Sequence, residues 1–378
     1  MFCSFSYDVF VHFLNCKFNK SGLKSRNIVA VATGNEYIYK LEPQTTNCLN
    51  MKKFILACSI LAFALFSCSG TDKKEETGGS DGGFVKKSYE QFPDPKIDNG
   101  MALLAPFAVN AVGVPVDTLR FEDGDSDPTW HLCCWNFENG LSKGIRTNAR
   151  YGVTFDDGTY SISRDDKGVI TMSVIASKAY DKPRTEGSQP WINFLIETSF
   201  ENIELRKCTN LVFSYDLLIL RCDNKTGDAY STNIHAAQCL TYLYLRNTNP
   251  ESEDYMKSLW LGVGSFDNRD NGGVSLQPST MWDVGTSTYM YGLADDRLFN
   301  TTDLLDNKWH TCKVYVKTVV KDAIRSLKEH GYMKTSVPDD FTVMGMNYGW
   351  EIPGVFDVCS QVRNFSLVSD TDLQALSE

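Results

Sequence analysis

Two stretches of the sequence place tryptophan close to aspartate, asparagine and arginine. Residues 260–270 read Trp-Leu-Gly-Val-Gly-Ser-Phe-Asp-Asn-Arg-Asp, Trp282 precedes an aspartate, and residues 346–351 form a later aromatic and polar run. Sugars present apolar C–H faces and many hydroxyl groups, which an indole ring and polar side chains can bind together. In a β-protein, tryptophan is otherwise mostly a core residue. The residues predicted to contact a glycan are Trp260, Asp267, Arg269, Trp282 and Trp350.

An arginine and a histidine suggest a different chemistry. Residues 184–186 read Arg-Thr-Glu and residues 233–235 read Asn-Ile-His. An arginine neutralises the carboxylate of a uronate, and a histidine can take the proton alpha to it. The fragments resemble the Arg-Thr-Glu and Gln-Ile-His strands of alginate lyases. The sequence departs from that pattern in three ways: Asn233 replaces the glutamine, Gly187 stands where a further apolar residue and an arginine are expected, and the Tyr-x-Lys-x-Gly strand is missing. The resemblance implies a lyase site around Arg184 and His235; the alternative is that both are ordinary structural residues.

Carboxylates raise two further possibilities, a metal site and a hydrolytic pair. Asp123, Asp125 and Asp127 alternate like the start of a calcium loop, but Pro128 and Cys134 stand where an EF-hand needs Gly and Glu. No cofactor other than calcium at these aspartates is expected. The sequence lacks the Glu-x-Asp-x-x-Glu strand of retaining β-glucanases, the Gly-x-Ser-x-Gly elbow and the His-Glu-x-x-His motif. We therefore predict a binding protein, with a glycosidase or polysaccharide lyase as the alternative.

A secretory signal begins well inside the chain, at Met51. Two lysines at 52–53 precede an apolar stretch at 54–66, which is shorter than the ~20 residues of a membrane-spanning helix. The exit Leu-Phe-Ser-Cys, which ends at Cys68, resembles the lipobox of bacterial lipoproteins. That resemblance implies cleavage before Cys68 and attachment of diacylglycerol to its thiol, which makes the outer membrane the expected partner and location.

The remaining N-terminal residues are interpreted around this signal. Residues 1–50 show no sustained period and are interpreted as a misassigned upstream extension, with a genuine cytoplasmic extension as the alternative. Residues 51–67 form the signal peptide, and residues 68–83, rich in Gly, Ser and charge, form a flexible acidic tether. The acidic run behind the cysteine resembles the export signal of surface lipoproteins in glycan-foraging Gram-negative bacteria, which implies cell-surface exposure. Residues 84–378 remain as a single domain.

Charge and cysteine usage limit the choice of partners. Residues 1–67 contain seven basic and three acidic residues, so the rest of the chain carries 30 basic and 44 acidic residues, a net charge of −14. Nucleic-acid binding depends on phosphate neutralisation and is therefore not expected. Beyond Cys68 the chain has seven cysteines, an odd number whose spacing matches no zinc site. We expect mostly buried thiols, without an assignable disulfide pairing.

In the sequence of the domain, apolar and polar residues mostly alternate with a period of two residues. Residues 170–174 and 312–317 alternate apolar and polar side chains, which is typical of strands with one face on the core. Residues 191–196, 211–220 and 240–245 are more uniformly apolar and predict strands that are buried on both faces.

One stretch, residues 320–331, has apolar residues at helical spacing and a glycine at its end, and so predicts a helix. Strands at 341–346 and 362–368 then close the sheets. Many short strands separated by turns are typical of a sandwich, and the closing residues resemble the end of concanavalin-like, carbohydrate-binding jelly rolls. We predict an all-β jelly-roll or concanavalin-like sandwich with one short helix. Its predicted function is to bind a polysaccharide or oligosaccharide in a glycan-uptake system. Besides the catalytic alternative, a third possible function is that of an adhesion or structural surface protein.

Overall fold

The computed structural model describes residues 28–33, 36–41, 87–105, 114–149, 152–283 and 288–373. The chain divides into two compact units, Met1–Lys52 and Lys53–Glu378. In the first unit, strands β1 (Ile28–Thr33) and β2 (Glu36–Leu41) form an antiparallel hairpin. The signal peptide, Cys68 and the tether lie outside the described residues. Within the described part, no helix is long and apolar enough to cross a membrane.

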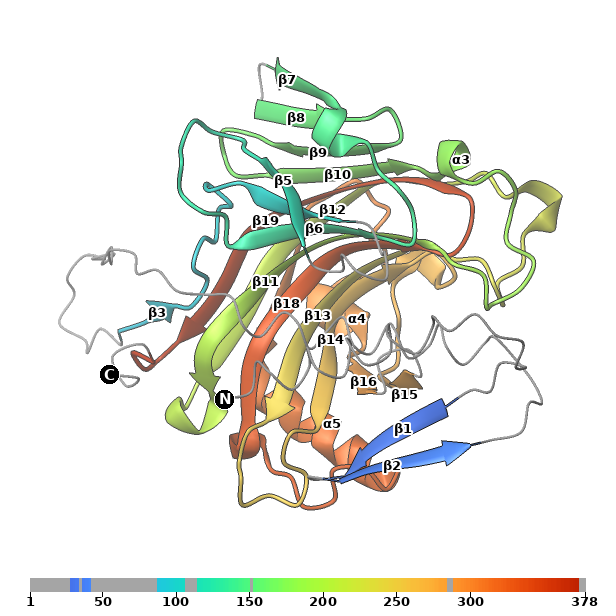
Figure 1. Cartoon of the computed structure of the whole chain (residues 1–378). Helices are drawn as coiled ribbons and strands as arrows, with labels where there is room; N and C mark the ends of the chain where they lie inside the picture. Colours follow the sequence, from blue (N-terminus) through green and yellow to red (C-terminus); the bar gives the residue numbers. More distant parts are fainter. Residues whose placement is uncertain are drawn as a thin grey trace. The chain divides into compact units, whose positions relative to one another are not determined.

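The second unit is built from two β-sheets (Figure 1). The smaller sheet has the order β17-β12-β19-β10-β9-β8-β7, with β3 on β19, and the larger has the order β15-β16-β14-β13-β18-β11-β6-β4-β5. This architecture confirms the predicted all-β jelly-roll sandwich. The first sheet contains β3 (Tyr89–Glu90), β7 (Ile145–Ala149), β8 (Gly152–Asp156), β9 (Tyr160–Arg164), β10 (Ile170–Ile175), β12 (Leu211–Asn224), β17 (His310–Tyr315) and β19 (Phe356–Ser369). The nine-stranded sheet contains β4 (Met101–Leu104), β5 (Pro115–Leu119), β6 (Trp130–Trp135), β11 (Ile192–Glu204), β13 (Gln238–Asn247), β14 (Ser258–Asp267), β15 (Ser279–Asp283), β16 (Thr288–Gly292) and β18 (Phe341–Ile352).

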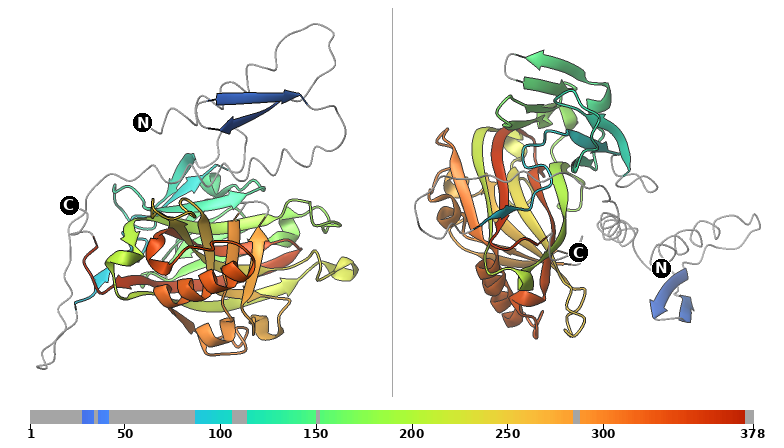
Figure 2. Two further views of the ribbon diagram at one scale, coloured as in Figure 1. Left: turned by 90° about the horizontal axis from the view of Figure 1, so that it is seen from below. Right: turned by 90° about the vertical axis from the view of Figure 1, so that its left-hand side faces the viewer.

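The core lies between the two sheets and is made by every second residue of their strands. Ile170, Met172 and Val174 of β10 are buried there, as the alternation in the sequence predicts. From the nine-stranded sheet, Phe194 of β11 and Trp350 of β18 belong to the same core. The long strands β11, β18, β13 and β14 lie side by side and curve strongly (Figures 1 and 2).

The predicted helix exists and is longer than the sequence pattern indicates. Helix α5 (Val316–Glu329) begins directly after β17, so the expected strand at 312–317 ends at Tyr315. Val316 fits both the alternating and the helical pattern, and the helix buries it with Val320 and Ile324. Two single-turn helices, α3 (Ala176–Ala179) and α4 (Asp295–Phe299), complete the α-helices of the described residues.

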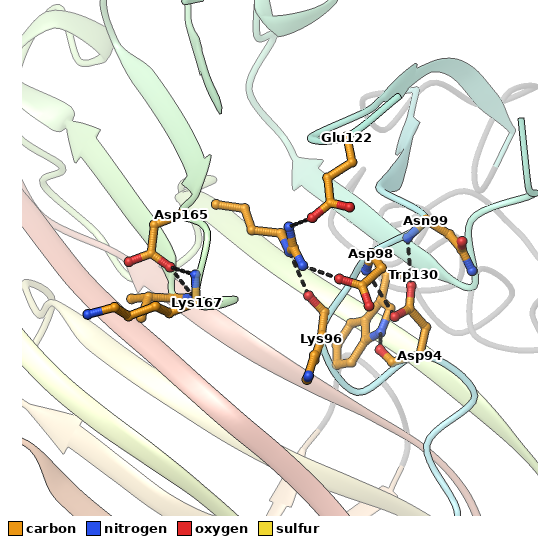
Figure 3. A network of polar contacts seen from close by, with 10 residues as sticks. Asp94, Lys96, Asp98, Asn99, Glu122, Trp130, Asp165 and Lys167 are labelled. Atoms are coloured by element: carbon orange, nitrogen blue, oxygen red, sulfur yellow. Dashed lines mark hydrogen bonds and ion pairs between the residues drawn. The ribbon is translucent and has the colours of Figure 1, made fainter. Parts of the chain in front are cut away.

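A buried arginine ties the first described segment of the domain to both sheets (Figure 3). Arg164, at the end of β9, is 5% exposed and its guanidinium donates to the carboxylates of Asp98 and Glu122. Asp94 accepts from the indole Nε1 of Trp130 on β6 through its carbonyl, at 2.8 Å. The two bonds from Arg164 to carboxylates are charge-assisted and so among the stronger ones in proteins. They fix residues 94–99 against β9 of one sheet and β6 of the other.

Candidate functional site

The nine-stranded sheet has a face that points away from the core, here called the outer face. Phe194 and Ile196 of β11 belong to the core. Because side chains alternate along a strand, Asn193 and Glu197 lie on the opposite side. The same alternation places Asn347 and Glu351 of β18 there, between the core residues Met346, Tyr348, Trp350 and Ile352. Across the two strands, Glu197 pairs with Asn347, and Asn193 pairs with Glu351.

Three aromatic rings form a row on the outer face. Tyr242 and Tyr244 of β13 alternate with core leucines, and Tyr244 pairs in register with Trp260 of β14. The Trp260 ring centroid lies 4.8 Å from that of Tyr244 and 5.7 Å from that of Tyr242. Gly262 stands opposite Tyr242, and a Cβ there would be in van der Waals contact with the tyrosine ring, 3.4 Å from its Cε1 atom. All three aromatic side chains are partly exposed.

A cluster of uncharged hydrogen-bonding groups surrounds Glu197. Burial raises the pKa of Glu197 to about 7, and a hydrogen bond with the Cys133 thiol only partly offsets that rise. His131 of β6 pairs in register with Glu197, and burial lowers the pKa of its imidazole. The Oε1 atom of Glu197 and the Oδ1 atom of Asn347 are buried without a hydrogen-bond partner. Buried polar atoms normally have partners, so these two oxygens have unused hydrogen-bonding capacity.

A second carboxyl group, Glu351, lies further along β18. The indole Nε1 of Trp191 donates to its Oε2 atom at 3.3 Å. Burial raises the pKa of Glu351, and the negative charge of Asp283 raises it further. Asp283 ends the edge strand β15, which is separated from β18 by three strands. The nine-stranded sheet therefore curls enough to bring the charge of its edge strand toward Glu351.

Glu197 and Glu351 are offset along the outer face, and the offset of their backbones exceeds the carboxyl separation of a catalytic pair. Glu351 stands four residues beyond Asn347, the register partner of Glu197, which corresponds to about 13 Å along a strand. Retaining glycosidases need carboxyls about 5–5.5 Å apart, and inverting enzymes need about 6.5–9.5 Å. The structure offers Asp283 as the nearer electrostatic partner of Glu351.

The predicted glycan-contacting residues divide between the two sides of the sheet. Trp260 lies on the outer face, and Asp267 ends the same strand, where it binds Gln238 at 2.8 Å and the guanidinium of Arg269. The prediction for Trp350 is wrong, because its side chain is fully buried in the core and donates to Ser360.

Trp282 is 45% exposed but lies on the other side of the sheet from Trp260. Met281, its neighbour in β15, pairs with Met290, which in turn pairs with Trp260, so these three share a face. Trp282 must then point to the opposite side, where its ring centroid lies 4.9 Å from that of Tyr289. Trp260 and Trp282 therefore cannot contribute to one binding site.

Arg184 and His235 lie together, as the sequence suggested, but in a structural role. The Arg184 guanidinium donates to four backbone carbonyls, those of residues 187, 189, 234 and 353. The Nε2 atom of His235 lies 2.7 Å from the carbonyl oxygen of Arg184, and its Nδ1 atom accepts from the amide of Ser231. Both side chains are buried, so neither is available to a uronate. Arg184 instead stacks over Trp191, with its Cζ atom 5.3 Å from the ring centroid.

The expected calcium site and the cysteines are placed as follows. Asp123, Asp125 and Asp127 are exposed. Among the described residues, no group of three His, Cys, Asp or Glu side chains could hold a metal ion. The seven cysteines of the domain are free thiols, and five of them are buried. Burial raises the pKa of Cys133, which keeps this outer-face thiol protonated.

The sequence interpretation missed the centre of the outer face. The Tyr-Leu-Tyr-Leu pattern of β13 was available as a signal, since its tyrosines alternate with core leucines. Residues 191–196 and 240–245 were expected to be buried on both faces; residues 192–196 are buried on both, but Tyr242 and Tyr244 are partly exposed on the outer face. Together, the fold and this face define an all-β sandwich protein that presents aromatic rings, amides and carboxyl groups on its larger sheet.

No family model and no curated protein matches this sequence. Among solved structures, the chain is similar to a thermostable cellulase derived from Rhodothermus marinus, with 10% identity and a TM-score of 0.34 over 64% of this chain and 100% of that one. A family 12 xyloglucanase from Bacillus licheniformis gives 10% identity and a TM-score of 0.29 over 59% and 96%. A family 11 xylanase from Neocallimastix patriciarum gives 8% identity and a TM-score of 0.26 over 59% and 99%. Similarities this low carry no argument about function, which must come from the residues of the chain.

Proposed function

We propose that this protein is a glycan-binding surface lipoprotein whose ligand lies on the outer face. The observation that supports the proposal most directly is the row of Tyr242, Tyr244 and Trp260 beside the unpartnered oxygens of Glu197 and Asn347. Aromatic rings cover the apolar face of a sugar, and its hydroxyl groups would supply the missing hydrogen bonds. The outward positions on either side of Asn347 are Gly345 and Gly349, so no side chain of its own strand covers its amide.

The direct test is binding of the full chain, extracted in detergent, to a panel of soluble polysaccharides. Affinity gel electrophoresis is expected to show retardation by at least one of them. The same samples are assayed for reducing ends and for the absorbance of unsaturated uronates. Retardation by none of a broad panel would contradict the proposal, because an aromatic row of this kind should bind at least one extended glycan.

A second candidate function on the same face is glycoside hydrolysis. It is favoured by the electrostatic coupling of Glu351 and Asp283, since hydrolysis needs a protonated and an ionised carboxyl. Glu351 would give its proton to the leaving oxygen as the glycosidic bond breaks. Asp283 would take a proton from water as the water oxygen bonds to the sugar carbon.

For a hydrolase, Glu351→Gln and Asp283→Asn are each expected to lower the release of reducing ends by at least about 100-fold, while affinity electrophoresis still shows retardation. Glu138→Gln, an exposed carboxyl outside the outer face, is the matched control. Wild-type protein that is retarded by a glycan but releases no reducing ends would eliminate hydrolysis and leave binding.

The lipid anchor is proposed from Cys68. Replacing Cys68 with Ala is expected to move the protein from the membrane to the soluble fraction, because acyl chains are the only membrane attachment in the proposal. Peptides from residues 1–50 are expected to be absent from mature protein analysed by mass spectrometry. A Cys68→Ala protein that stays in washed membranes after signal cleavage would refute the anchor, and recovered N-terminal peptides would refute the start at Met51.

A further inference from the structure

The outer face is unusually poor in basic residues. The nine strands of the sheet contain no lysine, and Arg246 is their only arginine. Carboxyl groups, in contrast, occur at outward positions on four of these strands. They belong to Glu197, Glu351, Asp267 and Asp283.

The two arginines near this face are poorly placed to receive an anionic sugar. Arg269, just beyond β14, is held by Asp267 through its Nε and Nη2 atoms. Arg246 follows Tyr242 by four residues on β13, which is about 13 Å along the strand. The middle of the face, where Tyr242 pairs with Asn347, therefore has no permanent cation among the described residues.

The groups around Glu197 can bind hydroxyls without carrying charge. Cys133 and His131 reach it from β6, and Asn347 and Tyr244 from β18 and β13. Burial raises the pKa values of Cys133 and Tyr244 and lowers that of His131, so each stays neutral near pH 7. A protonated Glu197 donates as well as accepts, which suits a sugar hydroxyl that does both.

We infer that the outer face takes an uncharged glycan and discriminates against uronate-containing or sulfated polysaccharides. This inference rests on the proposed glycan-binding function and names its ligand class. A carboxylate or sulfate on the sugar would lose its hydration among neutral groups and lie near the negative charge of Asp283, without a free cation. Burying a charge without a partner is costly, so the anionic ligand is excluded by repulsion as well as by desolvation.

The test compares matched pairs of polysaccharides that differ in charge. Hydroxyethyl cellulose is paired with carboxymethyl cellulose, galactan with polygalacturonate, and mannan with polymannuronate. The full chain in detergent is titrated with each, and the neutral member is expected to bind at least about tenfold more tightly. Raising the salt from about 0.05 M to about 0.5 M should leave neutral binding within twofold, because no ion pair with the ligand is screened.

The Arg246→Ala variant distinguishes binding of an uncharged glycan from binding of an anionic one. If the ligand is uncharged, this variant is expected to bind the retained neutral glycan within twofold of wild type. A wild-type protein that binds an anionic member more tightly than its neutral partner, and loses that binding in Arg246→Ala, overturns the inference while glycan binding stands. Failure of every pair to bind overturns both the ligand class and the proposed function.

Discussion

Alanine at Trp260 is expected to weaken binding of the retained glycan by about 10- to 100-fold, the loss of about 1.4–2.8 kcal/mol. The indole ring lies on the outer face and is held by the rings of Tyr242 and Tyr244. Removing it takes away the largest apolar surface that a sugar ring can cover. Isothermal titration calorimetry measures the change, and circular dichroism checks that the sheet is intact.

Trp282→Ala is the matched control for this experiment. It removes the same side chain from the same sheet, but from the opposite side, where Trp282 packs on Tyr289 and Tyr332. Its glycan affinity is expected to stay within twofold of wild type. If Trp282→Ala loses affinity while Trp260→Ala keeps it, the ligand lies on the other side of β15 and the outer face is not the site.

Glu197→Gln is expected to stabilise the folded protein at pH 8 by about 3 kcal/mol relative to wild type, with little difference at pH 4. Burial raises the pKa of Glu197 from its ordinary value of 4.5 to about 7. Between these two values the folded state holds a proton that the unfolded state has released. The free energy of unfolding of wild type therefore falls as the pH rises through this window and is level above it. Glutamine keeps the shape of the protonated acid and does not titrate.

Urea unfolding at several pH values measures this effect as a difference between variant and wild type. The subtraction is necessary because burial also raises the pKa of Asp295 to about 7, which adds its own loss of stability with rising pH. Glu138→Gln, at an exposed position, should give a flat difference curve. A Glu197→Gln curve that is equally flat would show that Glu197 is not desolvated, and would weaken its place in the proposed site.

Strand positions were readily predicted because alternation is a local property of the chain. The pattern at 170–174 identified β10, and the period of 320–331 identified α5, although its first turn was missed. It is harder to predict which side of a strand faces the core, because both sides of β11 and β13 carry large side chains. Trp260 and Trp350 look alike as sequence; only one of them points inward.

The centre of the outer face depends on pairings that no local pattern contains. Glu197 meets Asn347 across two strands that are about 150 residues apart in the chain, a register fixed by the packing of the whole sandwich. Glu351 and Asp283 interact only because three intervening strands curl. The fragments at 184–186 and 233–235 resembled a lyase only locally. In the structure, Arg184 and His235 hold a loop in place.

That loop has a consequence for genetics. His235 contacts the Arg184 carbonyl, the Arg184 guanidinium lies over Trp191, and Trp191 donates to Glu351. A mutational screen scored by growth on a polysaccharide would therefore recover Arg184 and His235 among its strongest losses, although neither reaches the outer face. Suppressors of those losses are expected to map to this loop rather than to the ligand-facing residues.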